Sequence, residues 1–370
     1  MKKFFLMLLS VCVLPLWVSA QKRTIVPGAE WPDNNGLHIN AHGGNIIQAD
    51  GTFFWYGESR PRGTHKAMPG ISLYTSPDLV NWKDCGIVLS TVQQPGSPIE
   101  YGCVMERPKV VFCPKTQKYV MLFHLELKGK GYSAAMMGFA QSDSPYGPFK
   151  FERALRPNAK CWPVDFKRKD KKLAQKQNPE DYKDWWTPEW RQAIEKGMFL
   201  WRDFQGGQMS RDQTVYVDDD GTAYQLTSSE DNLTLHLNEL TSDFLGFTGR
   251  FIRIAPGGQN EAPTLMKTGD TYWMITSGCT GWAPNEARMF SAKSLWGPWT
   301  QHPSPCIGHD AKKTFGAQGT YILKHGGRFI FMADRWMPKT LSESRHVWLP
   351  IEFGPDGTPQ IIWRDKWDIE

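Results

Sequence analysis

The 370-residue sequence lacks the short motifs that mark many enzyme classes. It has no GxSxG nucleophile elbow, no P-loop, no Rossmann glycine fingerprint and no HExxH motif, which excludes the chemistries that depend on those motifs. Its seven cysteines form no CxxC pair, so a zinc site is not expected. Helical periodicity is nearly absent, which argues against an α-helical fold.

Long apolar runs are also missing, except at the N-terminus. Two lysines precede an apolar run over residues 4–17, and small residues ending at Ala20 provide a cleavage site, which together predict a signal peptide over residues 1–20. The run is short for a membrane anchor, and no later stretch could span a bilayer. We therefore expect an exported protein, periplasmic or secreted, without a transmembrane segment. A lipid anchor on Cys12 is an alternative.

The charge pattern does not favour nucleic acid as a partner. The net charge is only +5, and part of the excess lies in one basic segment, residues 167–176. A nucleic-acid-binding protein would carry an ordered basic stripe, whereas this segment is typical of a solvated loop. After cleavage six cysteines remain, and both one or two disulfides and free buried thiols are compatible with their spacing.

Aromatic residues are abundant, at 13% of the chain with 17 tryptophans. Indole rings stack on the C–H faces of sugars, so this content fits a carbohydrate-binding surface. For most of the tryptophans, packing in the core of a β-rich protein is the simpler explanation.

A turn followed by an aromatic-rich strand occurs five times, which is the main signal for the fold. The five instances cover residues 50–56, 116–121, 220–224, 269–273 and 326–330. Three units end in a further turn phrase, at residues 75–82, 144–149 and 294–299. Five such units predict an all-β, five-bladed β-propeller that forms one domain over residues 21–370. A two-sheet sandwich is the main alternative.

One segment interrupts this rhythm between units two and three. Residues 155–205 carry basic runs and a short helical phrase at 188–194. We interpret the segment as a long inter-blade insertion over one face of the propeller, where it either walls the site or serves only as cover.

Three acids occupy the same place in three successive units, at the start of the expected innermost strand. They are Glu106, Asp212 and Glu261. Because inner strands line the axis of a propeller, these carboxylates are expected to converge on one small site. Their mutual repulsion would raise the pKa of at least one of them, as a general acid at neutral pH requires. Glu261 is the best candidate for the proton donor that glycoside hydrolysis needs.

The other two units have neutral residues at this place. Unit five has Gln318, and unit one has His42, which could serve as a hydrogen-bonding or cation-holding residue on the axis. We expect no required cofactor and no catalytic metal, with a structural cation in the channel as an open possibility.

The Glu-Ala-Pro phrase at 261, the Arg-Asp phrase at 211 with its Asp-Asp-Asp-Gly turn, and the five-unit rhythm resemble glycoside hydrolase family 43. This resemblance covers nearly all of residues 37–353. It implies a five-bladed propeller of inverting glycosidases, with Glu261 as the general acid and Asp212 tuning its pKa. The family usually carries its base as an Asp in blade one, but this chain reads Ala-His-Gly-Gly from residue 41.

That departure resembles the branch of exo-β-1,3-galactanases and related β-galactosidases. By this resemblance Glu106 would bind the sugar at the cleavage subsite, and Gln318 would position or activate water. A neutral amide is a poor base, so Gln318 would orient water or act through its imidic tautomer. The same resemblance places three further residues on loops near the substrate, Glu230, Trp282 and Asn285.

The sequence therefore predicts an inverting, exo-acting glycoside hydrolase that releases galactose from β-linked galactan or arabinogalactan chains. An α-L-arabinofuranosidase or a β-xylosidase of the same family is the nearest alternative, although the missing blade-one Asp counts against both. A catalytically inactive sugar-binding propeller is a second alternative, supported by the same missing base. A structural or protein-binding propeller fits least well with acids that converge on the axis.

Overall fold

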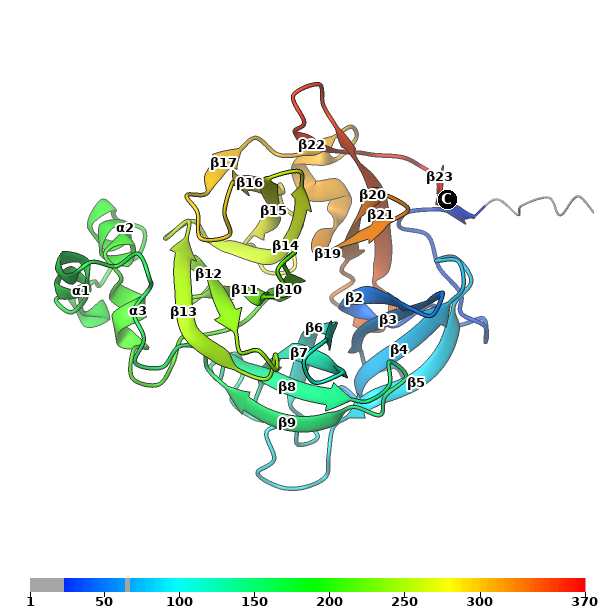
Figure 1. Cartoon of the computed structure of the whole chain (residues 1–370), viewed down its shortest axis with the longest axis horizontal. Helices are drawn as coiled ribbons and strands as arrows, with labels where there is room; N and C mark the ends of the chain where they lie inside the picture. Colours follow the sequence, from blue (N-terminus) through cyan, green and yellow to red (C-terminus); the bar gives the residue numbers. More distant parts are fainter. Residues whose placement is uncertain (1–22, 64–66, 370) are drawn as a thin grey trace, which may run out of the picture.

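The chain folds into five sheets, antiparallel except for one strand pair, that are arranged around a central axis, as Figure 1 shows in the view down that axis. The computed structural model describes residues 23–63 and 67–369. The prediction of an all-β, five-bladed propeller is confirmed, and the two-sheet sandwich is wrong. The predicted signal peptide, residues 1–20, lies outside the described residues.

Each of the first four blades contains four strands in sequence order from the axis outward. Blade 1 consists of β2 (His42–Ala49), β3 (Thr52–Ser59), β4 (Gly70–Ser76) and β5 (Lys83–Ser90). Blade 2 consists of β6 (Val104–Cys113), β7 (Lys118–Glu126), β8 (Met136–Ser142) and β9 (Lys150–Leu155). Blade 3 consists of β10 (Gln213–Val217), β11 (Ala223–Ser229), β12 (Thr234–Leu240) and β13 (Phe247–Ile254). Blade 4 consists of β14 (Asn260–Thr268), β15 (Thr271–Gly278), β16 (Arg288–Ala292) and β17 (Thr300–His302).

The fifth blade has five strands and lies next to the pairing of the two chain ends. It consists of β19 (Gln318–His325), β20 (Arg328–Arg335), β21 (Arg345–Phe353), β22 (Pro359–Ile362) and β18 (Cys306–Ile307). Its outermost strand, β18, pairs in parallel with β22. Near the two ends of the chain, β1 (Thr24–Ile25) pairs with β23 (Trp367–Asp368). Two short 3₁₀ segments, η2 (Ala311–Gly316) and η3 (Leu341–Glu343), connect strands near this blade.

The five repeated turns lie where the sequence predicts them, between the first and second strands of each blade. A two-residue turn at Asp50–Gly51 joins β2 to β3, for example, and Gly51 has the positive φ of 76° that this reversal requires. The three predicted end phrases lie one strand earlier than expected. They join the third strand to the fourth in blades 1, 2 and 4, so that β5, β9 and β17 still follow them.

The core lies mainly between neighbouring blades, because each sheet is apolar on both faces. One cluster of buried residues joins the facing sides of blades 1 and 2, and includes Phe54, Tyr56, Met121 and Phe123. Another joins blades 1 and 5 with both chain ends, through Trp55 and Trp348. Packing blade against blade leaves the polar starts of the inner strands free to face the axis.

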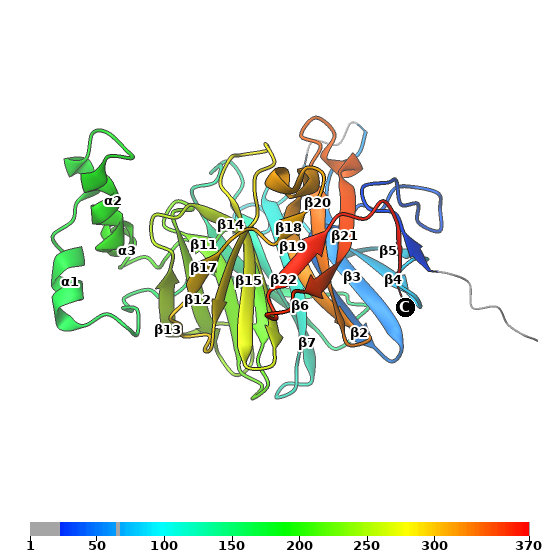
Figure 2. The same cartoon turned by 90° about the horizontal axis from the view of Figure 1, so that it is seen from above.

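Between β9 and β10 the chain forms the helices α1 (Arg168–Ala174), η1 (Pro179–Asp181), α2 (Pro188–Glu195) and α3 (Met198–Arg202). The helical phrase predicted at 188–194 is thus confirmed. Thr187 caps α2 by accepting a hydrogen bond from the backbone of Trp190, and Pro188 fits the first helical turn. Figures 1 and 2 place these helices beside the rim of the propeller near β13, and not over its central face as expected.

Two further expectations concern the membrane and the thiols. Within residues 23–63 and 67–369, no helix is long and apolar enough to cross a membrane. All six cysteines in this part of the chain are free thiols, so the disulfide alternative is not realised: Cys85, Cys103, Cys113, Cys161, Cys279 and Cys306.

Candidate active site

The five candidate residues lie at or beside the starts of the five inner strands. They are His42 on β2, Glu106 on β6, Asp212 directly before β10, Glu261 on β14 and Gln318 on β19. The inner strands surround the axis (Figure 1), and all five residues lie at or beside the starts of these strands, at one end of the channel. This arrangement matches the placement that the sequence predicts.

A repeated distortion of the backbone sets the direction of three of these side chains. The residue after each one has a left-handed φ, which is 62° at Gly43, 52° at Arg107 and 51° at Ala262. At each position the strand register also shifts by a β-bulge. Left-handed backbone is costly for residues other than glycine and bulges redirect side chains, so both features are typical of functional sites.

Arg107 connects three blades at the centre of the site. Its guanidinium lies 3.1 Å from Asp212 Oδ2, donates to Gln318 Oε1 at 2.5 Å and donates to the Gly319 carbonyl at 2.8 Å. Arg107 is 4% exposed. One buried cation thus fixes the acid of blade 3 relative to the amide of blade 5.

Glu261 is held by two neutral donors on one oxygen. Its Oε1 accepts hydrogen bonds from Asn232 Nδ2 at 2.7 Å and from Cys279 Sγ at 3.1 Å. Burial, and then the charge of Asp212, raise the pKa of Glu261 to about 7. The sequence predicts the repulsion between the acids correctly, but burial is the larger cause. A carboxyl group in this state can donate a proton at neutral pH.

Asp212 contacts the backbone of the next blade directly after Glu261. Its Oδ2 accepts a hydrogen bond from the amide of Ala262, the residue after Glu261, at 3.1 Å. The same oxygen faces Arg107. Asp212 therefore holds the start of β14 in place and keeps a negative charge near the acid.

Glu106 has the opposite environment. Its carboxylate accepts hydrogen bonds from Arg60 at 2.8 Å and Tyr132 at 2.9 Å, and lies 3.3 Å from His124 Nδ1. Burial alone would raise the pKa of Glu106, but Arg60 and His124 together hold it well below its usual range. The group stays ionised and suits the binding of sugar hydroxyls.

Arg60 also contacts a second buried acid, Glu58, at 3.1 Å. Burial raises the pKa of Glu58 to about 8, with the nearby charge of Glu106 adding to the effect and Arg60 opposing it. Arg60 therefore lies between two buried carboxyl groups, and Glu58 is the one whose pKa is raised.

The hydrogen bonds of Gln318 identify the tautomer of its side chain. Its Oε1 accepts from Arg107 and, at 2.9 Å, from Trp336 Nε1, and both of these groups can only donate. Its Nε2 donates to Ser277 Oγ at 3.0 Å. An imidic O–H at this position would face two donors and no acceptor, so these contacts favour the ordinary amide. Ser277 is also the cross-strand partner of Glu261, and lies between the acid and the amide.

Trp282 and Asn285 line a small cleft beside Gln318 and Trp336, with a volume of about 30 Å³. Trp282 is 48% exposed and packs edge-on against Trp336. Asn285 accepts from the backbone amide of Gly278 at 2.7 Å, which shapes the loop that presents Trp282. These two predicted residues therefore lie with Gln318, as expected.

Glu230 is completely buried, as His42 is, and forms a network apart from the channel acids. Its carboxylate forms hydrogen bonds with Arg253 at 2.6 Å and His236 at 2.9 Å. Burial alone would raise the pKa of Glu230, but Arg253 and His236 lower it to about 2. Glu230 begins a turn, residues 230–232, in which all three residues have a left-handed φ. Its contacts anchor the turn that presents Asn232 to Glu261.

His42 lies in a buried group with Asp334 and His346 whose ligand atoms all lie within 4.8 Å of one another. His346 donates from Nδ1 to Asp334 at 2.9 Å, and its Nε2 lies 3.1 Å from the Ile39 carbonyl. Nδ1 of His42 lies 3.5 Å from Asp334 Oδ1, at the outer limit of a hydrogen bond, and its Nε2 has no hydrogen-bond partner among the described residues. The unpartnered nitrogen and the carboxylate of Asp334 fit a cation as well as a water molecule.

Several contributors to the site are missing from the sequence-based prediction. Three of them lie next to a predicted residue, either along the chain or across the first hairpin of a blade. Arg107 follows Glu106, while Ser277 and Asp334 pair across strands with Glu261 and Gln318. The repeat alone could have identified these. Arg60, Trp336, Asn232 and Cys279 come from loops and strand ends, where the repeat gives no register.

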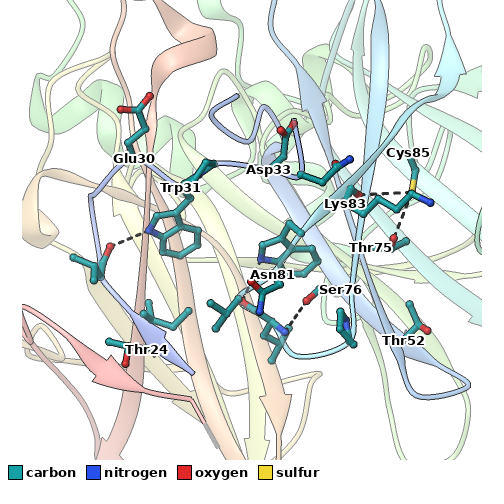
Figure 3. A pocket seen from close by; sticks show the side chains of 18 of the residues that line it. Thr24, Glu30, Trp31, Asp33, Thr52, Thr75, Ser76, Asn81, Lys83 and Cys85 are labelled. Carbon is teal, nitrogen blue, oxygen red and sulfur yellow. Dashed lines mark hydrogen bonds between the residues drawn. The ribbon is translucent and has the colours of Figure 1, made fainter. Parts of the chain in front are cut away.

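A much larger cavity lies elsewhere, at the outer edge of blade 1. It has a volume of about 860 Å³ and is formed by the N-terminal segment and the β4–β5 turn, with Trp31, Asn81 and Lys83 among its lining (Figure 3). None of the five residues at the inner-strand starts lines it. The five residues at the inner-strand starts therefore lie at the axis and not in this larger cavity.

The comparisons with known proteins agree with this geometry. Residues 184–359 match the model of Glycosyl hydrolases family 43. A search of curated proteins found no match.

Among solved structures, a family 43 β-1,3-galactosidase with galactodeoxynojirimycin is 53% identical, covers 93% of this chain and 100% of that chain, and has a TM-score of 0.90. An exo-β-1,3-galactanase variant from Phanerochaete chrysosporium, solved with β-1,3-galactotriose, is 32% identical over 94% of this chain and 69% of its own, with a TM-score of 0.74. An exo-β-1,3-galactanase from Clostridium thermocellum is also 32% identical, over 93% of this chain and 66% of its own, with a TM-score of 0.73. On the fold, the site and this identity over nearly its whole length, the chain belongs to glycoside hydrolase family 43.

Proposed function

We propose that the protein is an inverting, exo-acting β-1,3-galactosidase that releases galactose from the ends of galactan or arabinogalactan chains. The observation that carries this proposal is Glu261, a half-buried acid with a pKa of about 7. Ser277 pairs with Glu261 across the strands and accepts a hydrogen bond from Gln318, so it connects the acid to the amide. The 53% identity to a β-1,3-galactosidase supports the choice of substrate.

In this scheme Glu261 donates its proton to the glycosidic oxygen as the bond to the anomeric carbon breaks. A water molecule held beside Gln318 attacks that carbon from the opposite face, which inverts its configuration. Oε1 of Gln318 already accepts hydrogen bonds from Arg107 and Trp336, so it does not serve as a base. The role of Gln318 is to orient the water. The attacking water becomes strongly acidic once bonded to the cationic sugar and loses its proton to solvent, while Glu106 binds the sugar hydroxyls.

The experiment that tests the proposal is incubation of the purified mature protein with β-1,3-galactan and with arabinogalactan. We expect galactose as the released sugar by chromatography, and the α-anomer as the first product by proton NMR. Release of arabinose or xylose would be compatible with Glu261 as the acid but would overturn the galactose specificity. Absence of any product would favour a sugar-binding propeller.

We also propose that residues 1–20 direct export and are removed. The basis is the charged start, the apolar run and the small residues that end at Ala20. Mass spectrometry of the protein from its native cell envelope should find Gln21 as the first residue. A lipid on Cys12 would instead indicate anchoring.

The helices between β9 and β10 form an inserted segment that supports the site indirectly. Arg202 of α3 forms an ion pair with Asp231 at 2.5 Å, and Asp231 lies in the turn that presents Asn232. The carbonyls of Ile194 and Glu195 accept hydrogen bonds from Arg253, the partner of Glu230. The segment thus supports the 230–232 turn from outside the propeller.

We infer that no cation is needed for the reaction. Arg60 and Arg107 already bring buried positive charge to the acids. A cation bound by His42 and Asp334 would serve to join blades 1 and 5. Dialysis against EDTA should therefore leave kcat unchanged, and a bound structural cation would be detected as a lower melting temperature that calcium or another divalent ion restores.

A further inference from the structure

The two oxygens of Glu261 have unequal surroundings. Oε1 accepts from both Asn232 Nδ2 and Cys279 Sγ, whereas no hydrogen bond to Oε2 is found among the described residues. In a protonated carboxyl group one oxygen carries the hydrogen and the other keeps its lone pairs. An oxygen that already accepts two hydrogen bonds is the one that keeps its lone pairs. The proton of Glu261 is thereby directed to Oε2.

Cys279 remains a donor throughout the working range of pH. Burial, followed by the nearby charge of Glu261, raises the pKa of its thiol to about 12. Cys279 lies directly after β15 in the loop that also carries Trp282 and Asn285, and it is only partly buried. The thiol therefore links the acid to the loop that forms one side of the cleft.

Asn232, the other donor, is fixed by its own surroundings. The turn at residues 230–232 is left-handed at all three positions and is anchored by Glu230 and Asp231. Asn232 Nδ2 also lies 3.8 Å from the sulfur of Cys279. The two donors thus converge on one oxygen of Glu261 from two different blades, which fixes the rotation of the carboxyl group.

We propose that Cys279 is a positioning residue of the reaction: together with Asn232 it holds Oε1 of Glu261 as the accepting oxygen, so that Oε2 carries the proton to the glycosidic oxygen. The proposal rests on the proposed function of Glu261 as the acid. The thiol itself exchanges no proton with the substrate. Its hydrogen bond stabilises the ionised carboxylate that forms after proton transfer.

Kinetics of Cys279→Ala and Cys279→Ser test the proposal. Loss of the donor in C279A destabilises the ionised form of Glu261, so the alkaline limb of kcat/KM should move up by roughly 0.5–1 pH unit, and kcat should fall by about 5- to 10-fold. The hydroxyl of C279S can donate to the same oxygen, so it should keep kcat within about 3-fold of the wild type and leave the limb in place or lower. Cys85→Ala, which removes a partly buried thiol in blade 1, is the matched control and should behave as wild type.

Two kinetic results would overturn the proposal. One is an alkaline limb in C279A that stays at the wild-type pH. The other is a serine variant that loses as much activity as the alanine variant, with both proteins melting as the wild type does.

A second measurement needs no activity and separates this proposal from the proposed function. If the charge of Glu261 acts on the thiol, Glu261→Gln should lower the pKa of Cys279 and speed its alkylation by iodoacetamide at pH 9 by roughly 3- to 10-fold. Peptide mass spectrometry would follow Cys279, with Cys85 in the same sample as reference. Equal rates at Cys279 in both proteins would overturn the contact even in an active enzyme. Faster alkylation in Glu261→Gln, combined with a wild-type protein that releases no sugar, would uphold the contact and exclude the proposed hydrolase function.

Discussion

Glu106 and Glu261 occupy the same place in two blades, but their pKa values are shifted in opposite directions. Each lies in the first residues of an inner strand, and each is followed by a residue with a left-handed φ. Glu106 faces Arg60 and His124, and its pKa lies well below the usual range. Glu261 accepts hydrogen bonds from neutral donors, and burial with the like charge of Asp212 outweighs the opposing charges of Arg107 and Arg211, so its pKa rises to about 7. A repeated backbone therefore supplies position, while the neighbours decide which carboxyl binds and which donates a proton.

The largest effect is expected when Glu261, the proposed proton donor, is replaced. Glu261→Gln keeps the shape of the side chain but has no proton to donate, so kcat should fall by about 10³-fold or more. Steady-state kinetics on a β-1,3-linked galactoside would measure the loss. The melting temperature should stay near that of the wild type, and near-normal turnover would show that another group is the acid.

The matching change in blade 2 should affect binding instead. Glu106→Gln removes the charge that Arg60 and His124 face, so kcat/KM should fall by about 10²-fold, mainly through KM. The alkaline limb should stay near pH 7, since Glu261 keeps its environment. Glu100→Gln, at an exposed ion pair with Lys128, is the control. A limb that moves with Glu106 would contradict the separation of the two roles.

Asp212 increases the difference in pKa between Glu106 and Glu261. Its negative charge raises the pKa of Glu261, so Asp212→Asn should lower that pKa. The protonated acid is the active form, and the wild-type rate should fall as the pH rises through about 7. In the variant this alkaline limb should move down by about 1 pH unit, with roughly a 5-fold loss of kcat at pH 7. A limb that moves up would reverse our account of the pair.

The smallest effect is expected from the helical segment. Arg202→Met breaks the ion pair with Asp231 and loosens the turn that presents Asn232, so kcat should fall by about 2- to 4-fold while KM changes little. Arg250→Met, at an exposed pair with Glu239, provides the matched control. Equal activity of the two variants would show that the segment does not support the acid.

The sequence was sufficient for the parts of this molecule that repeat. The turns at Asp50–Gly51 and its four equivalents fix the first hairpins, and the hairpins fix which acids face the axis. The environment of each acid could not be predicted in the same way. Cys279, Asn232 and Trp336 lie in loops or just beyond strand ends, where no period relates one blade to another. The buried position of Glu230 depends on Arg253, a partner on another strand that its motif does not reveal.

The pairing of β1 with β23 has a consequence for how the protein must be made. Thr24 pairs with Asp368, which lies 344 residues later in the chain. A nascent chain cannot make this contact before residues 367 and 368 have been synthesised, so β1 stays without its partner strand until all the other described strands have been made. A bulky insertion beside either strand would hinder this closing contact.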